Sequence, residues 1–167
     1  MLALALLATY VTWTATRLDR LHARTDAART ALEVQLARRA ASALEVAAAQ
    51  HLDDLGATAS AAHHAEERDR LLRESELSEA LRRAVPVLAP DAAADLVEAG
   101  RRLVLARRFY NDAVRDTQSF RRRRLVRALR LAGHAPEPAF FDIDDALPAE
   151  RDTPPGRKGP GATEVVA

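Results

Sequence analysis

Cysteine is absent from this chain of 167 residues, and proline, glycine and aromatic residues are scarce. Without cysteine, the chain has no disulfide bond and no thiolate ligand for a metal. Six glycines, eight prolines and a 4% share of aromatic residues supply few of the turn formers and strand formers from which β-sheets are built. These absences exclude a disulfide scaffold and argue against a sheet.

The abundant residues favour helices instead. Alanine, leucine, arginine and glutamate, which recur throughout the sequence, are strong helix formers. The formal net charge of +1 specifies no class of partner. Lys158 is the only lysine among the 25 basic residues, and this arginine bias is typical of a genome rich in G and C. We therefore expect one all-α domain with terminal extensions.

Residues 1–16 (MLALALLATYVTWTAT) contain no charged side chain, and Tyr10 and Trp13 lie near the end that adjoins Arg17. Aromatic side chains in this position are typical of a membrane interface. A helix of this length reaches about 24 Å, whereas the hydrocarbon core of a bilayer measures roughly 30 Å. We predict an N-terminal membrane anchor, and a mis-assigned start at Met1 would explain why it is short.

Two other interpretations of residues 1–16 are a cleaved secretion signal and the first turns of a buried helix. A signal peptide begins with basic residues and ends at a helix break before its cleavage site. This segment begins without charge, and its helical pattern continues without glycine or proline. Four arginines from Arg17 to Arg29 follow it, and basic residues stay on the cytoplasmic side of a membrane segment. We expect a single-pass protein of the cell membrane with its bundle in the cytoplasm.

Residues 17–133 have the pattern of an antiparallel up-and-down helical bundle. Apolar residues recur at steps of three and four from Leu18 to Ala47, which places them on one face of a helix. No glycine or proline interrupts the chain before Gly56, which is a typical helix stop. We expect the first long helix to continue from the anchor and to end at Leu55.

Two more long helices and a short fourth helix are expected in this bundle. The second helix is predicted over residues 58–84 and the third over 91–119, separated by a turn with prolines at both ends. Asp91 is expected to cap the third helix, and the short helix covers residues 121–132. The inward residues of the second helix are predicted to be Leu71, Leu72, Leu77 and Leu81. The seam of the third is predicted to be Leu96, Gly100, Leu103, Arg107, Tyr110, Val114 and Thr117.

Residues 134–167 form the last predicted region, a tail rich in proline and glycine. Its six prolines preclude a stable helix over most of its length. Phe140, Phe141 and Ile143 are expected to dock back on the bundle. From about Leu147 the composition predicts a largely disordered linker.

Two motifs in the bundle resemble those of the LemA family. Residues 35–39 are Gln-Leu-Ala-Arg-Arg, similar to the family's Gln-Leu-x-Arg-Arg pattern, and residues 106–114 (ARRFYNDAV) are similar to its most recognisable signature. Departures at Gly100 and over residues 117–121 indicate a divergent branch. The resemblance covers about residues 17–118. It implies a membrane-anchored helical bundle of poorly defined molecular function, and it implies no catalytic residue.

The second motif carries polar groups on a stripe that faces the core. Arg107 and Tyr110 share this stripe with Leu103 and Val114, and a buried polar group needs a hydrogen-bonding partner. We expect both residues to be largely buried and to bond across helices. Acidic residues at the level of Arg107 on the neighbouring helices are its candidate partners. The candidates for a structural or interaction role are Arg39, Glu45, Glu66, Asp69, Arg107, Tyr110 and Asn111.

The sequence contains no constellation of residues for catalysis or metal binding. His63 and His64 are adjacent and point about 100° apart on a helix, so they cannot both face one metal. No serine has a paired base, and no glycine-rich phosphate loop is present. We expect no enzymatic activity, no metal and no cofactor.

The densest charge feature is a basic patch between Arg121 and Arg130. Such a patch suits the phosphate groups of nucleic acid or of anionic lipid. With three long helices, however, the patch lies at the end of the bundle far from the anchor. This position favours a solvated cap or a protein contact. The patch consists of Arg121, Arg122, Arg123, Arg124, Arg127 and Arg130.

The sequence as a whole predicts a non-catalytic, membrane-anchored bundle that acts as an interaction or scaffold module. It would act by self-association or by binding an unknown protein partner near the membrane. The alternative is a soluble helical module that binds nucleic acid or anionic lipid through the basic patch. Nucleic acid is the less favoured partner, because the formal net charge is only +1.

Overall fold

The computed structural model describes residues 1–123, 126–127 and 136–144, without the side chain of Leu7. These residues are helical apart from turns and one extended segment, and no strand occurs among them. The prediction of an all-α antiparallel bundle is therefore confirmed. The helices are α1 (Leu2–Gln50), α2 (Asp53–His63), α3 (Arg70–Ala84), the short 3-10 helix η1 (Val85–Val87) and α4 (Pro90–Arg121).

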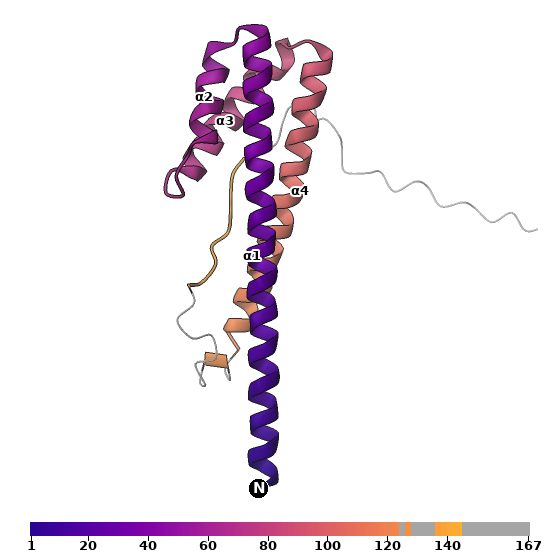
Figure 1. Cartoon of the computed structure of the whole chain (residues 1–167), viewed down its shortest axis with the longest axis vertical. Helices are drawn as coiled ribbons and strands as arrows, with labels where there is room; N and C mark the ends of the chain where they lie inside the picture. The colour runs from indigo at the N-terminus through magenta and orange to yellow at the C-terminus, as the bar shows by residue number, and fades with distance from the viewer. Residues whose placement is uncertain (124–125, 128–135, 145–167) are drawn as a thin grey trace, which may run out of the picture.

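The longest helix, α1, is the axis of the molecule (Figure 1). Helices α2 and α3 form an antiparallel hairpin against the end of α1 that lies farthest from the N-terminus. Helix α4 then runs antiparallel to α1 along much of its length, and these two helices share the most extensive contact in the fold. The N-terminal end of α1 extends beyond the end of α4 (Figure 1). None of the helices in the described part of the chain combines the length and the apolar character that crossing a bilayer demands.

The first helix ends earlier than the sequence predicts. Helix α1 stops at Gln50, and His51 adopts a left-handed conformation with φ 56°. The backbone N–H groups of His51 and Leu52 both donate to the carbonyl of Ala47, which satisfies the helix end. Gly56 lies inside α2 rather than at a helix stop. The prediction failed because His51, whose side chain tolerates this conformation better than most, provides the turn that glycine usually provides.

The second predicted helix is two helices. The helix is interrupted between His64 and Asp69, where a connection of mostly exposed residues joins α2 to α3. On α3, Leu77 and Leu81 are buried as predicted. Leu71 and Leu72, predicted to face inward, are 44% and 57% exposed. At about 100° per residue, Leu72 lies on the helix face opposite Leu81 and Leu71 lies at the flank of that face, so the four leucines do not share one inward stripe.

Because there is one more helix than predicted, α4 runs in the direction opposite to the predicted one. With three long helices, α4 would run away from the N-terminus; with a hairpin of α2 and α3, it runs back towards it (Figure 1). The side chain of Phe120 consequently packs with that of Leu18. The predicted place of the basic patch, far from the N-terminal segment, is therefore wrong. The error arises because the sequence analysis did not predict the turn between α2 and α3.

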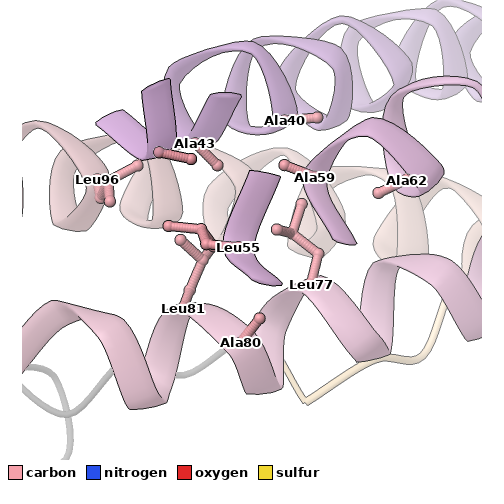
Figure 2. Close-up of a cluster of buried hydrophobic side chains, with 10 residues drawn as sticks. Ala40, Ala43, Leu55, Ala59, Ala62, Leu77, Ala80, Leu81 and Leu96 are labelled. Carbon is pink, nitrogen blue, oxygen red and sulfur yellow. The ribbon is translucent and has the colours of Figure 1, made fainter. Parts of the chain in front are cut away.

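Small side chains let the helices approach closely near the hairpin. Alanines from α1 and α2 lie against leucines from α3 and α4 in one buried cluster (Figure 2). An alanine contributes little apolar area itself, but it brings the backbone of one helix near the leucines of the next. The labelled members of this cluster are Ala40, Ala43, Leu55, Ala59, Ala62, Leu77, Ala80, Leu81 and Leu96.

The seam predicted for the last long helix is largely correct. All of its seven members are buried in α4 except Arg107, which is only half-buried. The helix begins at Pro90, with Ala89 as its N-cap and without a side-chain cap, so the prediction that Asp91 caps it is wrong. Proline suits the first position, because its missing N–H has no partner there in any helix. Asp91 instead adds its charge to the first turn.

Candidate functional site

A buried ion pair joins α1 to α3. Nη2 of Arg39 lies 2.6 Å from Oε2 of Glu74, and both side chains are 1% exposed. The same Nη2 donates to the backbone carbonyl of Glu74 at 3.3 Å, and Nη1 donates to Oγ of Ser78 at 3.0 Å. Among the described residues, Nε of Arg39 has no hydrogen-bond partner. The guanidinium is thus held by one short turn of α3.

The environment of this pair opposes the charge of Glu74. Burial raises the pKa of the Glu74 carboxyl, and the neighbouring Arg39 opposes that rise without cancelling it. Because desolvation offsets much of the attraction, such a pair adds little net stability but is costly to break. Its geometric effect is to fix how α3 is placed along α1.

The arginine of this pair was among the sequence candidates for a structural role, but its partner was not. Arg39 belongs to the Gln-Leu-Ala-Arg-Arg motif and lies on the buried face of α1 between Leu36 and Ala40. Glu74 was not predicted, because a glutamate is rarely fully buried. The available signal is its spacing, since Glu74 precedes the buried residues Leu77 and Leu81 by three and seven positions.

The ion pair expected on α4 does not have the predicted form. Arg107 is half-buried rather than buried, and Glu45 is exposed. Oxygens of Glu66 and Asp69 lie 3.2 and 3.4 Å from the guanidinium of Arg68. The break between α2 and α3 places both acids in an exposed connection, where a local arginine reaches them.

Tyr110 and Asn111, from the motif at residues 106–114, hold an extended segment. We call this segment, residues 136–144, the strap. Oη of Tyr110 donates to the carbonyl of Ala139 at 2.8 Å. The side-chain amide of Asn111 donates to the carbonyl of Phe141 and accepts from its N–H, both at 2.9 Å. Tyr110 is buried as predicted, and burial raises the pKa of its hydroxyl. Its partner is a backbone carbonyl, not a side chain of another helix.

Further polar side chains extend this contact in both directions. Gln118 donates to the carbonyl of Pro138 at 2.9 Å, and Arg121 donates to that of Pro136 at 3.2 Å. At the other end, Arg82 lies 3.0 Å from the carboxylate of Asp144. Most of these groups bind the backbone of the strap, so most of these polar contacts do not depend on which side chains the strap carries.

Apolar side chains complete the docking of the strap. Ile143 is 6% exposed and belongs to the cluster of Leu32, Leu103 and Val114, against which Phe141 also packs. The prediction that this part of the tail returns to the bundle is confirmed for these two residues, whereas Phe140 remains 44% exposed. The predicted linker from about residue 147 lies outside the described residues.

A cavity of about 370 Å³ lies between the strap and the bundle. Tyr110 and Phe141 line it together with charged residues of α1 and of the connection between α2 and α3. Nη2 of Arg29 lies 2.7 Å from Glu67, and Nε lies 3.0 Å from Glu33. The lining holds two arginines, Arg29 and Arg70, against the four carboxylates of Asp26, Glu33, Glu67 and Glu137, so the cavity has a surplus of negative charge.

The described part of the basic patch lies beside α1. The Arg17 guanidinium carbon stands 5.8 Å from the centre of the Trp13 ring and 5.5 Å from that of Phe120. The guanidinium carbon of Arg123 stands 4.8 Å from the centre of the same Phe120 ring. Cation–π contacts of this kind join the end of α4 to the N-terminal third of α1. Arg122 and Arg127 are exposed, and Arg124 and Arg130 lie outside the described residues.

One exposed apolar face remains between α1 and α4. Leu105 and Phe109 are 54% and 58% exposed and lie one helical turn apart on α4. They line a groove of about 240 Å³ with the small residues Ala28 and Ala31 of α1. Large apolar side chains beside a shallow groove of alanines are typical of a surface that packs against another helix.

The described histidines form no metal site, and His134 lies outside the described residues. The rings of His63 and His64 contact each other edge to face, with centres 5.1 Å apart. Within the described residues there is no group of three or more histidine, cysteine, aspartate or glutamate side chains placed to hold a metal. No family model, no curated protein and no solved structure matches the chain.

Proposed function

We propose that this chain is a non-catalytic, membrane-anchored helical bundle of the LemA type, which acts by interaction near the membrane. The observation that carries the proposal is the N-terminal part of α1. It extends beyond the end of α4 (Figure 1), and its large apolar side chains are mostly exposed. Leu2, Leu4 and Leu6 are 76%, 66% and 63% exposed, and Trp13 is 54% exposed. Apolar surface of this kind is stable only against lipid or another protein.

The assignment to the LemA type rests on the two motifs and on what their residues contact. Arg39 from the first motif pairs with Glu74, and Tyr110 and Asn111 from the second hold the strap. Each of these polar side chains therefore has a role in holding the fold together. These structural roles account for these polar residues of the two motifs without any catalytic role. This supports the proposal of a protein without catalysis.

An interaction role is supported by the exposed face that contains Leu105 and Phe109. This face is on the long α1–α4 part of the bundle, and the strap is bound through the other side chains of α4. A second copy or an unknown protein partner would bury both side chains. Phe109→Ser should then reduce association in cross-linking of native membranes, whereas Arg108→Ser at the neighbouring exposed position should leave it unchanged.

Membrane extraction tests the anchor. We expect the full chain to remain with membranes after carbonate washing and to float with them in a density gradient. A variant with Leu4, Leu6 and Trp13 replaced by serine should move to the soluble fraction, while Leu71→Ser, an exposed leucine of α3, should not. Recovery of the wild type in the soluble fraction would contradict the proposal.

Protease accessibility tests the orientation. The bundle follows the apolar segment together with the arginines of α1, so we propose that it lies in the cytoplasm. Protease should cleave the bundle in inverted membrane vesicles but not in intact cells. Cleavage in intact cells would reverse the orientation without affecting the anchor.

A further inference from the structure

We infer that the arginines at the junction between the N-terminal segment and the bundle bind the phosphate groups of anionic phospholipids. This inference rests on the proposed membrane anchor and assigns it a lipid preference. It also goes beyond that proposal, because an anchor alone has no preference among head groups. We call these arginines the basic collar; they are Arg17, Arg20 and Arg24 on α1 and Arg121, Arg122 and Arg123 at the end of α4.

One half of the collar is built by helical spacing. Trp13, Arg17, Arg20 and Arg24 follow one another at steps of four, three and four, so they share one face of α1. Together with Thr16 and Leu21 they line a groove of about 240 Å³. The groove thus combines an indole ring at the apolar end with three guanidinium groups next to it. A phospholipid has the same order of chemistry along its length, with acyl chains followed by a phosphate.

The other half of the collar is supplied by the return of α4. The ring of Phe120 lies beneath the guanidinium groups of both Arg17, in α1, and Arg123, just after the end of α4, so one aromatic side chain holds both arginines at the same level. Arg121 adds a contact of 3.5 Å between its Nη1 and Nε2 of His22. The charge is therefore fixed in place by the fold and is not spread along a flexible tail.

Neighbouring acidic residues neutralise only part of the collar, which therefore keeps a net positive charge. Arg24 pairs with Asp116 at 3.2 Å, and Arg122 lies 3.9 Å from Glu137. In the described part of the chain, Arg17, Arg20 and Arg123 form no ion pair, and all three are exposed. A guanidinium presents two parallel N–H groups to a phosphate, which makes arginine well suited to this ligand.

The position of the collar selects a lipid surface rather than a nucleic acid. The side chains immediately before the collar are the exposed apolar residues of the N-terminal segment, which a nucleic acid would leave in water. In a membrane these residues enter the apolar phase and place the arginines at the level of the head groups. Each basic residue held near an anionic bilayer surface contributes a factor of about five in affinity.

Trp13 provides the measurement, because it is the only tryptophan in the chain and it lines the groove. The full chain is reconstituted in mixed phosphatidylcholine and phosphatidylglycerol vesicles, in which either one lipid or the other carries bromine, which quenches indole fluorescence on contact. We expect brominated phosphatidylglycerol to quench Trp13 roughly two-fold or more strongly than brominated phosphatidylcholine at the same mole fraction. High salt should reduce this preference.

Two charge-matched triple variants make the test specific. Replacing Arg17, Arg20 and Arg123 with glutamine should abolish the preference, while quenching by both lipids persists. Replacing Arg38, Arg101 and Arg108, which are exposed elsewhere, should leave the preference intact. Because all six side chains are exposed, both variants are expected to fold.

The possible outcomes separate the inference from the anchor on which it rests. Equal quenching by the two lipids in the wild type overturns the collar but leaves the anchor in place. Loss of the preference in the control variant also overturns the collar, because net charge would then suffice. Absence of quenching by either lipid overturns the anchor and the collar together. Displacement of anionic lipid from Trp13 by a DNA oligonucleotide would identify nucleic acid as the true ligand of the arginines.

Discussion

The side chain of Asn111 and the backbone of Phe141, thirty residues apart, are joined by two hydrogen bonds of 2.9 Å, one donated in each direction. An amide group presents the same donor and acceptor as a peptide bond, so Asn111 binds the strap as a neighbouring strand would. This explains why a helix can hold an extended segment without any sheet. It also gives asparagine a specific role at position 111, which aspartate or leucine cannot fill.

We predict that Asn111→Ala releases the strap. Two hydrogen bonds are lost and the peptide groups of Phe141 lose their partner, so the free energy of unfolding should fall by about 1 to 3 kcal/mol. The exchange rate of the Phe141 amide hydrogen should rise by more than that of the amides in the centre of α4. Asp112→Ala, at the exposed neighbouring position, is the control and should have little effect. Unchanged exchange at Phe141 would show that the other contacts of the strap hold it without Asn111.

We predict that Arg39→Met is strongly destabilising. It leaves the carboxylate of Glu74 buried without its partner, and breaking a buried pair in this way costs about 3 to 5 kcal/mol. Arg38→Met at the adjacent exposed position should change stability by less than about 0.5 kcal/mol. The double variant Arg39→Met with Glu74→Leu should recover most of the loss in urea unfolding, because no charge is then buried. A double variant as unstable as Arg39→Met would mean that shape rather than charge governs this site.

The pH dependence of Glu74 gives a separate prediction. Burial raises its pKa above the ordinary 4.5, so the folded state binds this proton more tightly than the unfolded state. Stability due to this group therefore falls as pH rises from 4.5 through the folded pKa. Relative to Glu74→Gln, which does not titrate, the wild type should lose stability over that interval and then remain level. A relative gain with rising pH would show that Arg39 outweighs burial and lowers the pKa.

Periodicity was sufficient to predict the long helices and most of their buried faces. The stripe of α1 and the seam of α4 both follow from steps of three and four, because a long uninterrupted helix keeps one phase. The connection between α2 and α3 contains neither glycine nor proline, so it lacks the residues from which the end of a helix is usually predicted. The missed break had the largest consequence, since it determined the direction of α4 and the location of the basic patch.

The candidate site was predicted only as far as residue type and position allow. The motif identified Arg39, Tyr110 and Asn111, and polar groups on a buried stripe do require partners. Their partners were not predictable in the same way. Glu74 belongs to a residue type that is rarely fully buried, and the strap offers its backbone, which has no sequence signal. For Arg107 the prediction of burial itself failed, because a position on the seam of a helix can still be half-exposed.

We predict last that Gly56→Ala stabilises the protein, which distinguishes the observed fold from the one expected from sequence. At a helix stop in the left-handed conformation, alanine in place of glycine costs about 1 kcal/mol or more. Inside α2, where Gly56 lies, glycine is instead about 0.5 to 1 kcal/mol worse than alanine. A Cβ added there would stand 3.5 Å from Cβ of Ala47, an ordinary contact that requires no movement.

The free energy of unfolding should therefore rise by up to about 1 kcal/mol in Gly56→Ala, and the thermal midpoint should rise with it. His51→Gly is the paired measurement, because His51 is the residue that adopts the left-handed conformation. Glycine relieves strain at that position but increases the freedom of the unfolded chain, so we expect a small gain or no change. A destabilised Gly56→Ala variant would place the end of α1 at Gly56 after all.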